Sequence, residues 1–426
     1  MKLLHNAKVI VGFDLCDTYA QISYANIDSD SVETLSSVAG AEIYNVPAVL
    51  CKKEGVNHWL YGKDALAEQG GIVIENLLSL AISGEPIQIE ENSYQPEALL
   101  TLFCKRCLGM LSQITVPDKI AALMITCKTM DNRILEVLEQ VVAGLGLKTD
   151  RIFFQSHTES FYYYMLYQPE ELWLRQSLLC EYRDNSILVY RMECNRRTTP
   201  VVVYMEEGKY PFTAYEPMPE GEALRKEKME RMDEEFLHLL ENICHNQMIS
   251  SVYLIGEHFS EEWMKESLRY LCKGRRVFQG SNLFSKGACF GILERLKPGE
   301  IGKAHVFLGN DKLKTNVGMR ILRRGQDSYY ALLDAGVNWY EAEENIEFYL
   351  QDGNSVELLL TSLIGGQNRL AEITLEGLSE GNSRLQMRLY LKDEKHLVVE
   401  VEDLCFGVFR PATHRVWQEE LELENG

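Results

Sequence analysis

The sequence predicts two successive α/β lobes followed by an all-β domain, and two observations carry this prediction. The pattern of hairpin, strand, helix, strand and helix occurs twice, over residues 1–175 and again over residues 176–300, without any repeat of the sequence itself. From residue 304 to 426 helical periodicity gives way to runs in which apolar and polar residues alternate, as in half-buried strands. The segment LKPGEIGK (296–303) has the Pro and Gly content of a linker between these parts.

The first lobe begins with a hairpin over residues 8–26 and ends with an aromatic helix that starts near His157. Ile134, Val137, Leu138 and Val141 recur at three- and four-residue steps, which predicts one apolar helix face ended by GLGL. The other expected elements are strands at 47–52, 58–61, 120–126 and RIFF (151–154), and helices at 62–69 and 96–114.

The second lobe is expected to repeat this order with a shorter outer part. Its expected elements are a hairpin at 177–192, strands at 200–205 and 251–256, and helices at 219–246, 260–272 and 282–296. In the last domain the alternation is clearest in two sets of apolar residues, Val356, Leu358 and Leu360, and then Leu385, Met387, Leu389 and Leu391. Turn-forming stretches such as QDGNS and SEGNS separate the runs, which predicts a β-sandwich-like domain.

Composition argues against several classes of partner. There are 63 acidic and 43 basic residues, and the net charge of -20 disfavours nucleic acid and anionic membranes, which require clustered Lys and Arg. No apolar run is long enough to span a bilayer, and the N-terminus lacks the pattern of a signal peptide. The eleven Cys are scattered, so we expect reduced thiols in a cytoplasmic protein, with Cys104 and Cys107 of CKRC facing a helix core.

Several stretches, in order along the chain, resemble one known family. They include VGFDLCDTYAQISYAN, VPAVLCKK with YGKDALAE, MITCKTMDNRILEVLEQVVAGLGL, LLCEYRDNSILVY, SVYLIGEHFSEEWMKESL, SKGACFGIL and SVELLLTSLIGG. Together they look like a DnaK-type heat-shock chaperone of the actin-like ATPase superfamily. The resemblance implies an actin-like fold of two lobes, 1–175 and 176–300, with a reduced outer subdomain in the second. It also implies that 304–426 is like the chaperone's substrate-binding β-sandwich, without the helical lid.

The resemblance also implies where a nucleotide would lie. In this family two hairpins hold the phosphates through backbone N–H groups of Gly-rich turns, while an Asp stands in the magnesium shell. Asp14 matches the metal-associated position, and it would hold Mg²⁺ only if nucleotide binds. The remaining matched positions form a degenerate nucleotide site, namely Cys16, Asp17 and Thr18 in the first hairpin, Glu181, Arg183 and Ser186 in the second, Gly256 in the adenosine-like turn, and Gly291.

The departures from the family pattern remove the chemistry of the site. Cys16 replaces a Gly at the closest phosphate approach, and Asp17 replaces a hydroxyl with an anion. A carboxylate about 4 Å from a phosphate charge costs about 4 kcal/mol per unit charge at an effective dielectric near 20. Leu66 stands where the family has its catalytic Lys. Gln155, Ser156 and His157 replace the Asn-Glu-Pro that orients water, and we interpret His157 as a capping or packing residue.

We therefore expect no catalytic residues and no bound cofactor, in a DnaK-like pseudo-ATPase that acts as a chaperone-like or adaptor protein. Its partner would be another protein or an extended peptide. Two alternatives stay open. One is a divergent but active ATP-dependent chaperone, in which Asp14, Thr18, Ser186, Gly256 and Gly291 bind Mg-ATP and Arg183 replaces the loop glycines. The other is a structural scaffold subunit of a multiprotein assembly.

Overall fold

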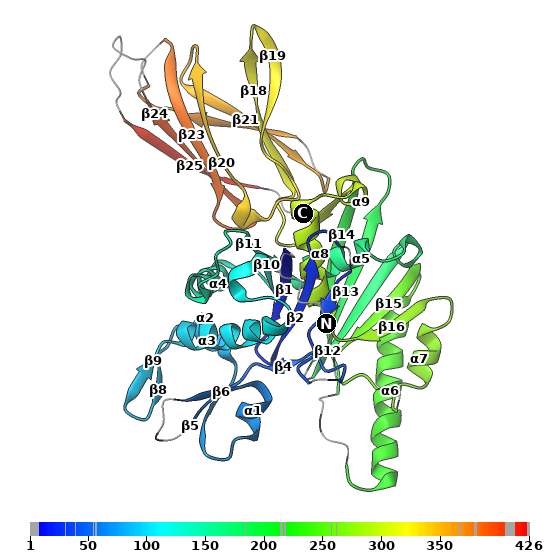
Figure 1. Cartoon of the computed structure of the whole chain (residues 1–426). Helices are drawn as coiled ribbons and strands as arrows, with labels where there is room; N and C mark the ends of the chain where they lie inside the picture. The colour runs from blue at the N-terminus through cyan, green and yellow to red at the C-terminus, as the bar shows by residue number, and fades with distance from the viewer. Residues whose placement is uncertain are drawn as a thin grey trace. The chain divides into compact units, whose positions relative to one another are not determined.

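A computed structural model describes residues 8–423 except 30, 39, 54, 56, 57, 184, 214, 215, 217, 218, 257, 261, 366, 367, 379, 380 and 405–413. The chain divides into two compact units, Met1–Val306 and Phe307–Gly426, which are described separately (Figure 1). The chain contains both helices and strands, and its C-terminal unit is rich in strands. No helix among the described residues is long and apolar enough to cross a membrane.

A mixed sheet forms the first half of the first unit. Its strands lie in the order β11-β10-β1-β2-β3, and a short strand, β4, also pairs with β2. The hairpin of β1 and β2 is antiparallel, whereas β10 and β11 run parallel to β1. The bounds are β1 Val9–Leu15, β2 Tyr19–Asn26, β3 Glu33–Thr34, β4 Val46–Pro47, β10 Ile120–Cys127 and β11 Ile152–Ser156. Every residue of β1 is buried, so the predicted first hairpin is confirmed as a central element.

A second sheet has the same strand order and the same strand directions. Its strands follow the order β16-β15-β12-β13-β14, with β12, β13 and β14 antiparallel and β15 and β16 parallel to β12. The bounds are β12 Gln176–Arg183, β13 Ser186–Asn195, β14 Val201–Pro211, β15 Ile249–Ile255 and β16 Arg276–Gly280. The second hairpin is confirmed, but the sequence analysis missed β16. Four of the five residues of β16 are exposed, so it lacks the apolar alternation that marks a strand.

Helices cover these sheets, and their ends follow from local sequence. Asp131 caps α4 by accepting a hydrogen bond from the Ile134 amide, and Gly146 ends it in the left-handed conformation. The bounds are α1 Gly62–Ala67, α2 Leu77–Ser83, α3 Pro96–Gly109, α4 Asn132–Leu145, α5 His157–Leu166, α6 Glu222–Cys244, α7 Glu266–Leu271, α8 Leu283–Leu296 and α9 Glu300–Ala304. Short strands beside α1–α3 are β5 Leu50–Lys53, β6 Trp59–Tyr61, β7 Gly71–Ile74, β8 Ile87–Ile89 and β9 Asn92–Tyr94.

One helix of each half, α5 in the first and α8 in the second, packs across the other half. From α5, which follows the first sheet, Phe161 and Tyr164 meet the Tyr253 ring of the second sheet with centroids 6.0 and 5.9 Å apart. From α8, which follows the second sheet, Ala288 and Ile292 share a core with residues of the first sheet. The two helices also contact each other directly. Figure 1 shows α5 and α8 between the two sheets. This exchange joins the two halves into one unit.

Three predicted elements differ from the structure. The helix expected over 260–272 spans only Glu266–Leu271, and the one expected over 96–114 ends at Gly109 before a short 3₁₀ helix, Met110–Gln113. The expected linker at 296–303 is wrong in part, because it contains the start of α9. Gly299 directly precedes this helix, so Pro and Gly mark a helix boundary here and not an extended linker.

The second unit contains two four-stranded antiparallel sheets, ordered β19-β18-β21-β22 and β20-β23-β24-β25. The alternation in the sequence is confirmed, because Val356, Leu358 and Leu360 are buried and so are Leu385, Met387, Leu389 and Leu391. The bounds are β18 Thr315–Arg323, β19 Gln326–Leu333, β20 Glu343–Leu350, β21 Ser355–Ser362, β22 Arg369–Thr374, β23 Ser383–Leu391, β24 His396–Asp403 and β25 Val416–Glu422. Before them, β17 (His305–Leu308) spans the boundary between the units.

Candidate functional site

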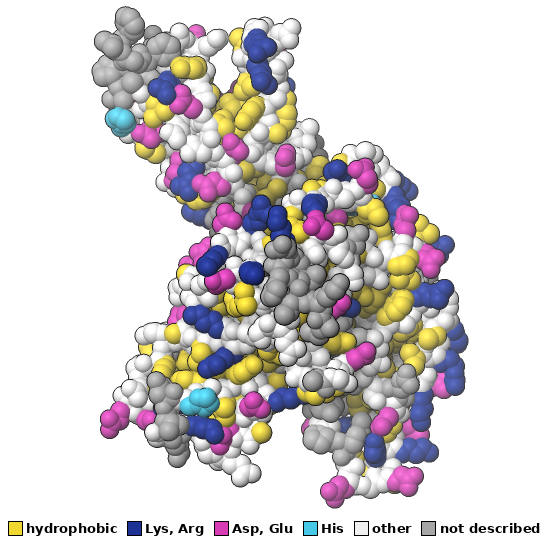
Figure 2. Space-filling view, in the orientation of Figure 1, with side chains coloured by type: hydrophobic (Ala, Val, Ile, Leu, Met, Phe, Trp, Pro, Cys, Tyr) yellow, Lys and Arg dark blue, Asp and Glu magenta, His cyan; other side chains and the backbone are white. Residues whose placement is uncertain are grey.

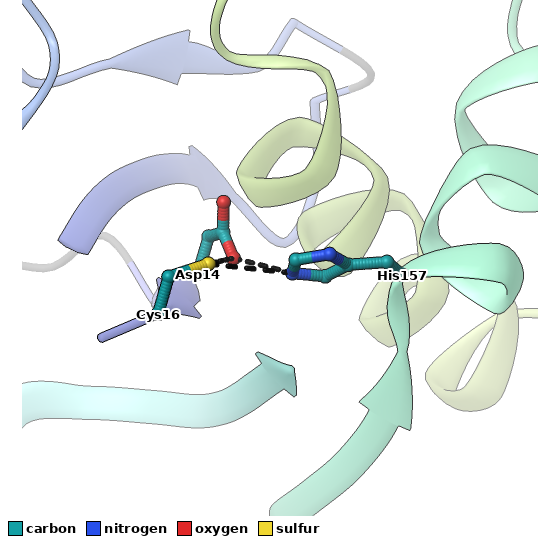
Figure 3. Close-up of side chains that lie close together, drawn as sticks. All are labelled: Asp14, Cys16 and His157. Carbon is teal, nitrogen blue, oxygen red and sulfur yellow. Dashed lines mark hydrogen bonds and ion pairs between the residues drawn. The ribbon is translucent and has the colours of Figure 1, made fainter. Parts of the chain in front are cut away.

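The ends of two hairpins and the start of one helix meet in the first unit. Asp14 lies near the end of β1, Cys16 lies in the turn that follows, and His157 is the first residue of α5. All three are buried, with Asp14 1% and His157 0% exposed. Figure 3 shows the three side chains pointing toward one another. The parallel pairing of β1 with β10, and of β10 with β11, brings these chain ends to one edge of the sheet.

A short contact between Asp14 and His157 dominates this cluster. The His157 Nε2 and Asp14 Oδ1 atoms are 2.7 Å apart. The Cys16 Sγ lies 3.7 Å from the same Oδ1 and 4.0 Å from the same Nε2. The ring of His157 stacks on Phe284 from α8, with centroids 3.9 Å apart and planes 11° apart. His157 therefore packs as the sequence analysis proposed, and it also contacts the Asp14 carboxylate.

Arg183 connects the second hairpin to the first. Its Nε donates to Glu181 Oε1 at 2.5 Å, and its Nη2 lies 3.9 Å from the Cys16 Sγ. Arg183 pairs with Ser186 at the end of the hairpin, and the Ser186 hydroxyl donates to the Arg183 carbonyl at 3.4 Å. The structure thus brings Asp14, Cys16, Glu181, Arg183 and Ser186 together. The guanidinium occupies the space between the two hairpin tips.

The electrostatics keep Cys16 a thiol. Burial and the nearby Asp14 carboxylate raise the pKa of Cys16 well above its usual value, and Arg183 opposes this only in part. The backbone N–H of Cys16 donates to the Tyr19 carbonyl at 2.9 Å inside the hairpin turn. A phosphate at this turn would therefore find neither a thiolate nor a free Cys16 amide.

Asp17 and Thr18 face away from this cluster. The carboxylate of Asp17 accepts hydrogen bonds from the Ser79 amide at 2.8 Å and from the Ser79 hydroxyl at 2.6 Å. Ser79 lies in the first turn of α2, so Asp17 supplies the cap that the helix's own sequence lacks. The Thr18 residue is exposed, and its carbonyl accepts from the Ala48 amide at 3.0 Å. The structure therefore gives Asp17 a helix-capping position.

The two glycines of the expected nucleotide site are in different surroundings. Gly256 follows β15 with a φ of +106° and borders a hollow of about 290 Å³ that is also lined by Asn45, Gln279 and Ser281. A Cβ at Gly291 would lie 2.5 Å from Gln155 Oε1 and 3.1 Å from Tyr163 Cδ2, so this glycine lets α8 pack closely against those two side chains.

Two contacts of the site were not found by sequence reasoning. The Asp14–His157 pair joins residues 143 positions apart. The Gln21 Nε2 atom donates both to Asn45 Oδ1 and to the Ser281 carbonyl, each at 2.5 Å, and so ties the first hairpin to the edge of the hollow near Gly256. Neither contact has a local sequence signature, because the partners come from distant segments. The available signal was an acid near the end of one strand, Asp14, and a histidine directly after another, His157.

Comparison with known proteins identifies the family of this chain. A search of the curated proteins found no match. Residues 312–423 match a model described as a domain of unknown function, DUF8552. Residues 31–310 match a model described as the C-terminal part of a family of unknown function, DUF5716. Because the second of these matches covers more than half of the chain, the protein belongs to the DUF5716 family.

Proposed function

We propose that this chain is an actin-like, DnaK-like pseudo-ATPase that acts by binding another protein. Two features support the actin-like part of the proposal. The two sheets share one strand order and one set of strand directions, and α5 and α8 each pack across the opposite half. A duplicated unit of this kind places two hairpins tip to tip, which is the arrangement that the DnaK resemblance implies.

The observation that carries the pseudo-ATPase part is the contact of Arg183 with both hairpins. The guanidinium binds Glu181 and approaches the Cys16 sulfur, while His157 engages Asp14. Phosphate oxygens would have to displace a buried network of charges, and each ion left without its partner costs several kcal/mol. The positions that would hold a triphosphate are thus occupied by the protein's own side chains.

Thermal unfolding with and without Mg-ATP tests this part. A ligand at 100 times its Kd raises the free energy of unfolding by about 2.7 kcal/mol, so millimolar Mg-ATP would reveal even weak binding. We expect no shift of Tm beyond that given by MgCl₂ alone. A clear upward shift that Asp14→Asn abolishes would favour the divergent active ATPase instead.

A basic and aromatic hairpin in the second unit supports the protein-binding part. Large apolar side chains are exposed on both faces of the β18–β19 hairpin, with Leu322 56%, Tyr329 52% and Tyr330 40% exposed. Arg320, Arg323 and Arg324 are exposed beside them, and none of them forms an ion pair with another described residue. Figure 2 shows basic side chains at the end of this hairpin.

The chemistry of this hairpin fits an acidic segment of a partner protein. Tyr and Arg are the residue types most enriched at the centres of protein interfaces. The three arginines are positive, whereas the chain as a whole carries a net charge of -20. The hairpin is therefore electrostatically complementary to an acidic segment of a partner. A nucleic acid is the weaker match, because the rest of the chain would repel it.

Proximity labelling in cells tests whether the β18–β19 hairpin binds a partner protein. We expect the variant Arg320→Glu/Arg323→Glu/Arg324→Glu to lose at least one partner with an acidic segment, while the fold and the response to Mg-ATP stay unchanged. The matched control is Arg106→Glu/Arg151→Glu/Arg197→Glu, which makes the same change of charge at three exposed arginines of the first unit. Equal labelling by both variants would show that the hairpin does not bind the partner.

A further inference from the structure

We propose that Asp14, Cys16 and His157 form a binding site for a transition-metal dication, and that Zn²⁺ fits it best. One ligand atom from each residue, Oδ1, Sγ and Nε2, lies within 4.8 Å of the other two. This proposal stands on the cluster alone and is independent of the pseudo-ATPase proposal. A nucleotide-bound Mg²⁺ would instead use Asp14 without the sulfur.

The distances in the cluster are close to those of a tetrahedral site. Zn²⁺ binds Cys sulfur at about 2.3 Å and His nitrogen or carboxylate oxygen at about 2.0–2.2 Å, which places ligand atoms about 3.4–3.6 Å apart. The observed separations are 3.7 Å between sulfur and oxygen, 4.0 Å between sulfur and nitrogen and 2.7 Å between nitrogen and oxygen. Shifts of less than about 1 Å would therefore admit the ion between the three atoms.

The three proposed ligands come from two neighbouring chain segments, so they can chelate one ion. Asp14 and Cys16 are two positions apart at the end of β1, and His157 comes from the first residue of α5. Thiolate and imidazole are ligands for Zn²⁺, whereas Mg²⁺ prefers oxygen ligands in octahedral geometry and keeps several waters. Three protein ligands leave a fourth tetrahedral position for water or another small ligand.

Two buried polar atoms of the cluster give a second argument. Asp14 Oδ2 and His157 Nδ1 have no hydrogen-bond partner among the described residues. Buried polar atoms are rarely left without a partner, so the cluster has polar atoms to spare for a ligand.

The competing explanation is a direct hydrogen bond between His157 and Asp14. Such a bond accounts for the 2.7 Å contact without involving the sulfur. The two explanations differ in what Cys16 does, because only a metal makes its sulfur a ligand. They also differ in metal content, since the hydrogen bond needs no metal in the purified protein.

Metal analysis of the full chain, purified without chelators, is the first test. We expect about one Zn²⁺ per chain in the wild type and at least a fivefold loss in Cys16→Ser and in His157→Gln. Cys272→Ser is the matched control, because Cys272 is exposed and lies outside the cluster. Zinc that is absent from the wild type, or that Cys272→Ser removes as readily as Cys16→Ser, would overturn the proposal.

A second measurement uses only the wild-type chain, so it holds even if the variants do not fold. Metal-free protein is titrated with Co²⁺ and followed by absorbance, where a thiolate ligand gives a near-ultraviolet charge-transfer band. We expect saturation at about one Co²⁺ per chain, with release of about one proton from the Cys16 thiol. Binding without that band would mean that no thiolate ligates the ion, and the site as proposed would be wrong.

Discussion

Replacing Gly287 by alanine destabilises the first unit by about 3 kcal/mol or more, because the new methyl group has no space. A Cβ at Gly287 would lie 1.9 Å from the Ser160 carbonyl oxygen and 2.6 Å from its carbon, both of them backbone atoms of α5. No side-chain rotation relieves such an overlap, so α8 has to move away from α5. Since these two helices join the halves of the unit, the displacement would weaken the packing in both halves. Denaturant unfolding followed by circular dichroism measures the loss.

Gly109 is the matched control for this substitution. It is the last residue of α3, and a Cβ there would meet nothing within 4 Å. Alanine has a higher helix propensity than glycine, so Gly109→Ala is expected to be neutral or to stabilise by up to about 1 kcal/mol. If the two substitutions gave equal changes, close packing of α5 and α8 would not be a source of stability.

Removing the imidazole of His157 is expected to cost about 3–5 kcal/mol, because it leaves the Asp14 carboxylate buried without its partner. The experiment is His157→Ala, measured by denaturant unfolding in the presence of a chelator so that any bound metal does not contribute. His238→Ala is the control, since His238 is an exposed residue of α6 and its loss should change stability by no more than about 0.5 kcal/mol.

A double-mutant cycle separates the pair from simple loss of packing. Asp14→Asn in the background of His157→Ala removes the orphaned charge, so the double variant should recover part of the stability lost in the single variant. The expected coupling energy is about 1–3 kcal/mol. Additive effects would show that His157 contributes by its stacking on Phe284 and not by its contact with Asp14.

The sequence predicted the parts of the fold that have strong local patterns. β1 and β2, β12 and β13, α4 and the strands of the second unit all carry apolar periodicity and turn signals, and the structure has them where they were expected. The strand β16 was missed because four of its five residues are exposed, and α7 was predicted too long at its N-terminal end. Their positions depend on tertiary contacts, such as the Asp233 carboxylate of α6, which accepts from the Glu266 and Ser267 amides at the start of α7.

The candidate site was predicted only as a set of positions. Local comparison placed Asp14, Cys16 and Arg183 at two hairpin tips, but their contacts depend on how distant strands pair. Asp17 illustrates the limit, because its charge was expected to face a phosphate and it caps α2 instead. Gly291 was expected near a nucleotide, and it packs against Gln155. Asp14 and His157 are in contact although they lie 143 residues apart in the sequence. Neither segment alone indicates such a contact.

A crystal structure of the full chain grown with millimolar Mg-ATP tests the central claim most directly. The account predicts that the Arg183 guanidinium stays between Glu181 and the Cys16 sulfur, that His157 stays beside Asp14, and that no nucleotide lies between residues 14–18 and 181–186. A triphosphate bound between these two segments, with a cation beside Asp14 and Arg183 turned toward its oxygens, would contradict it.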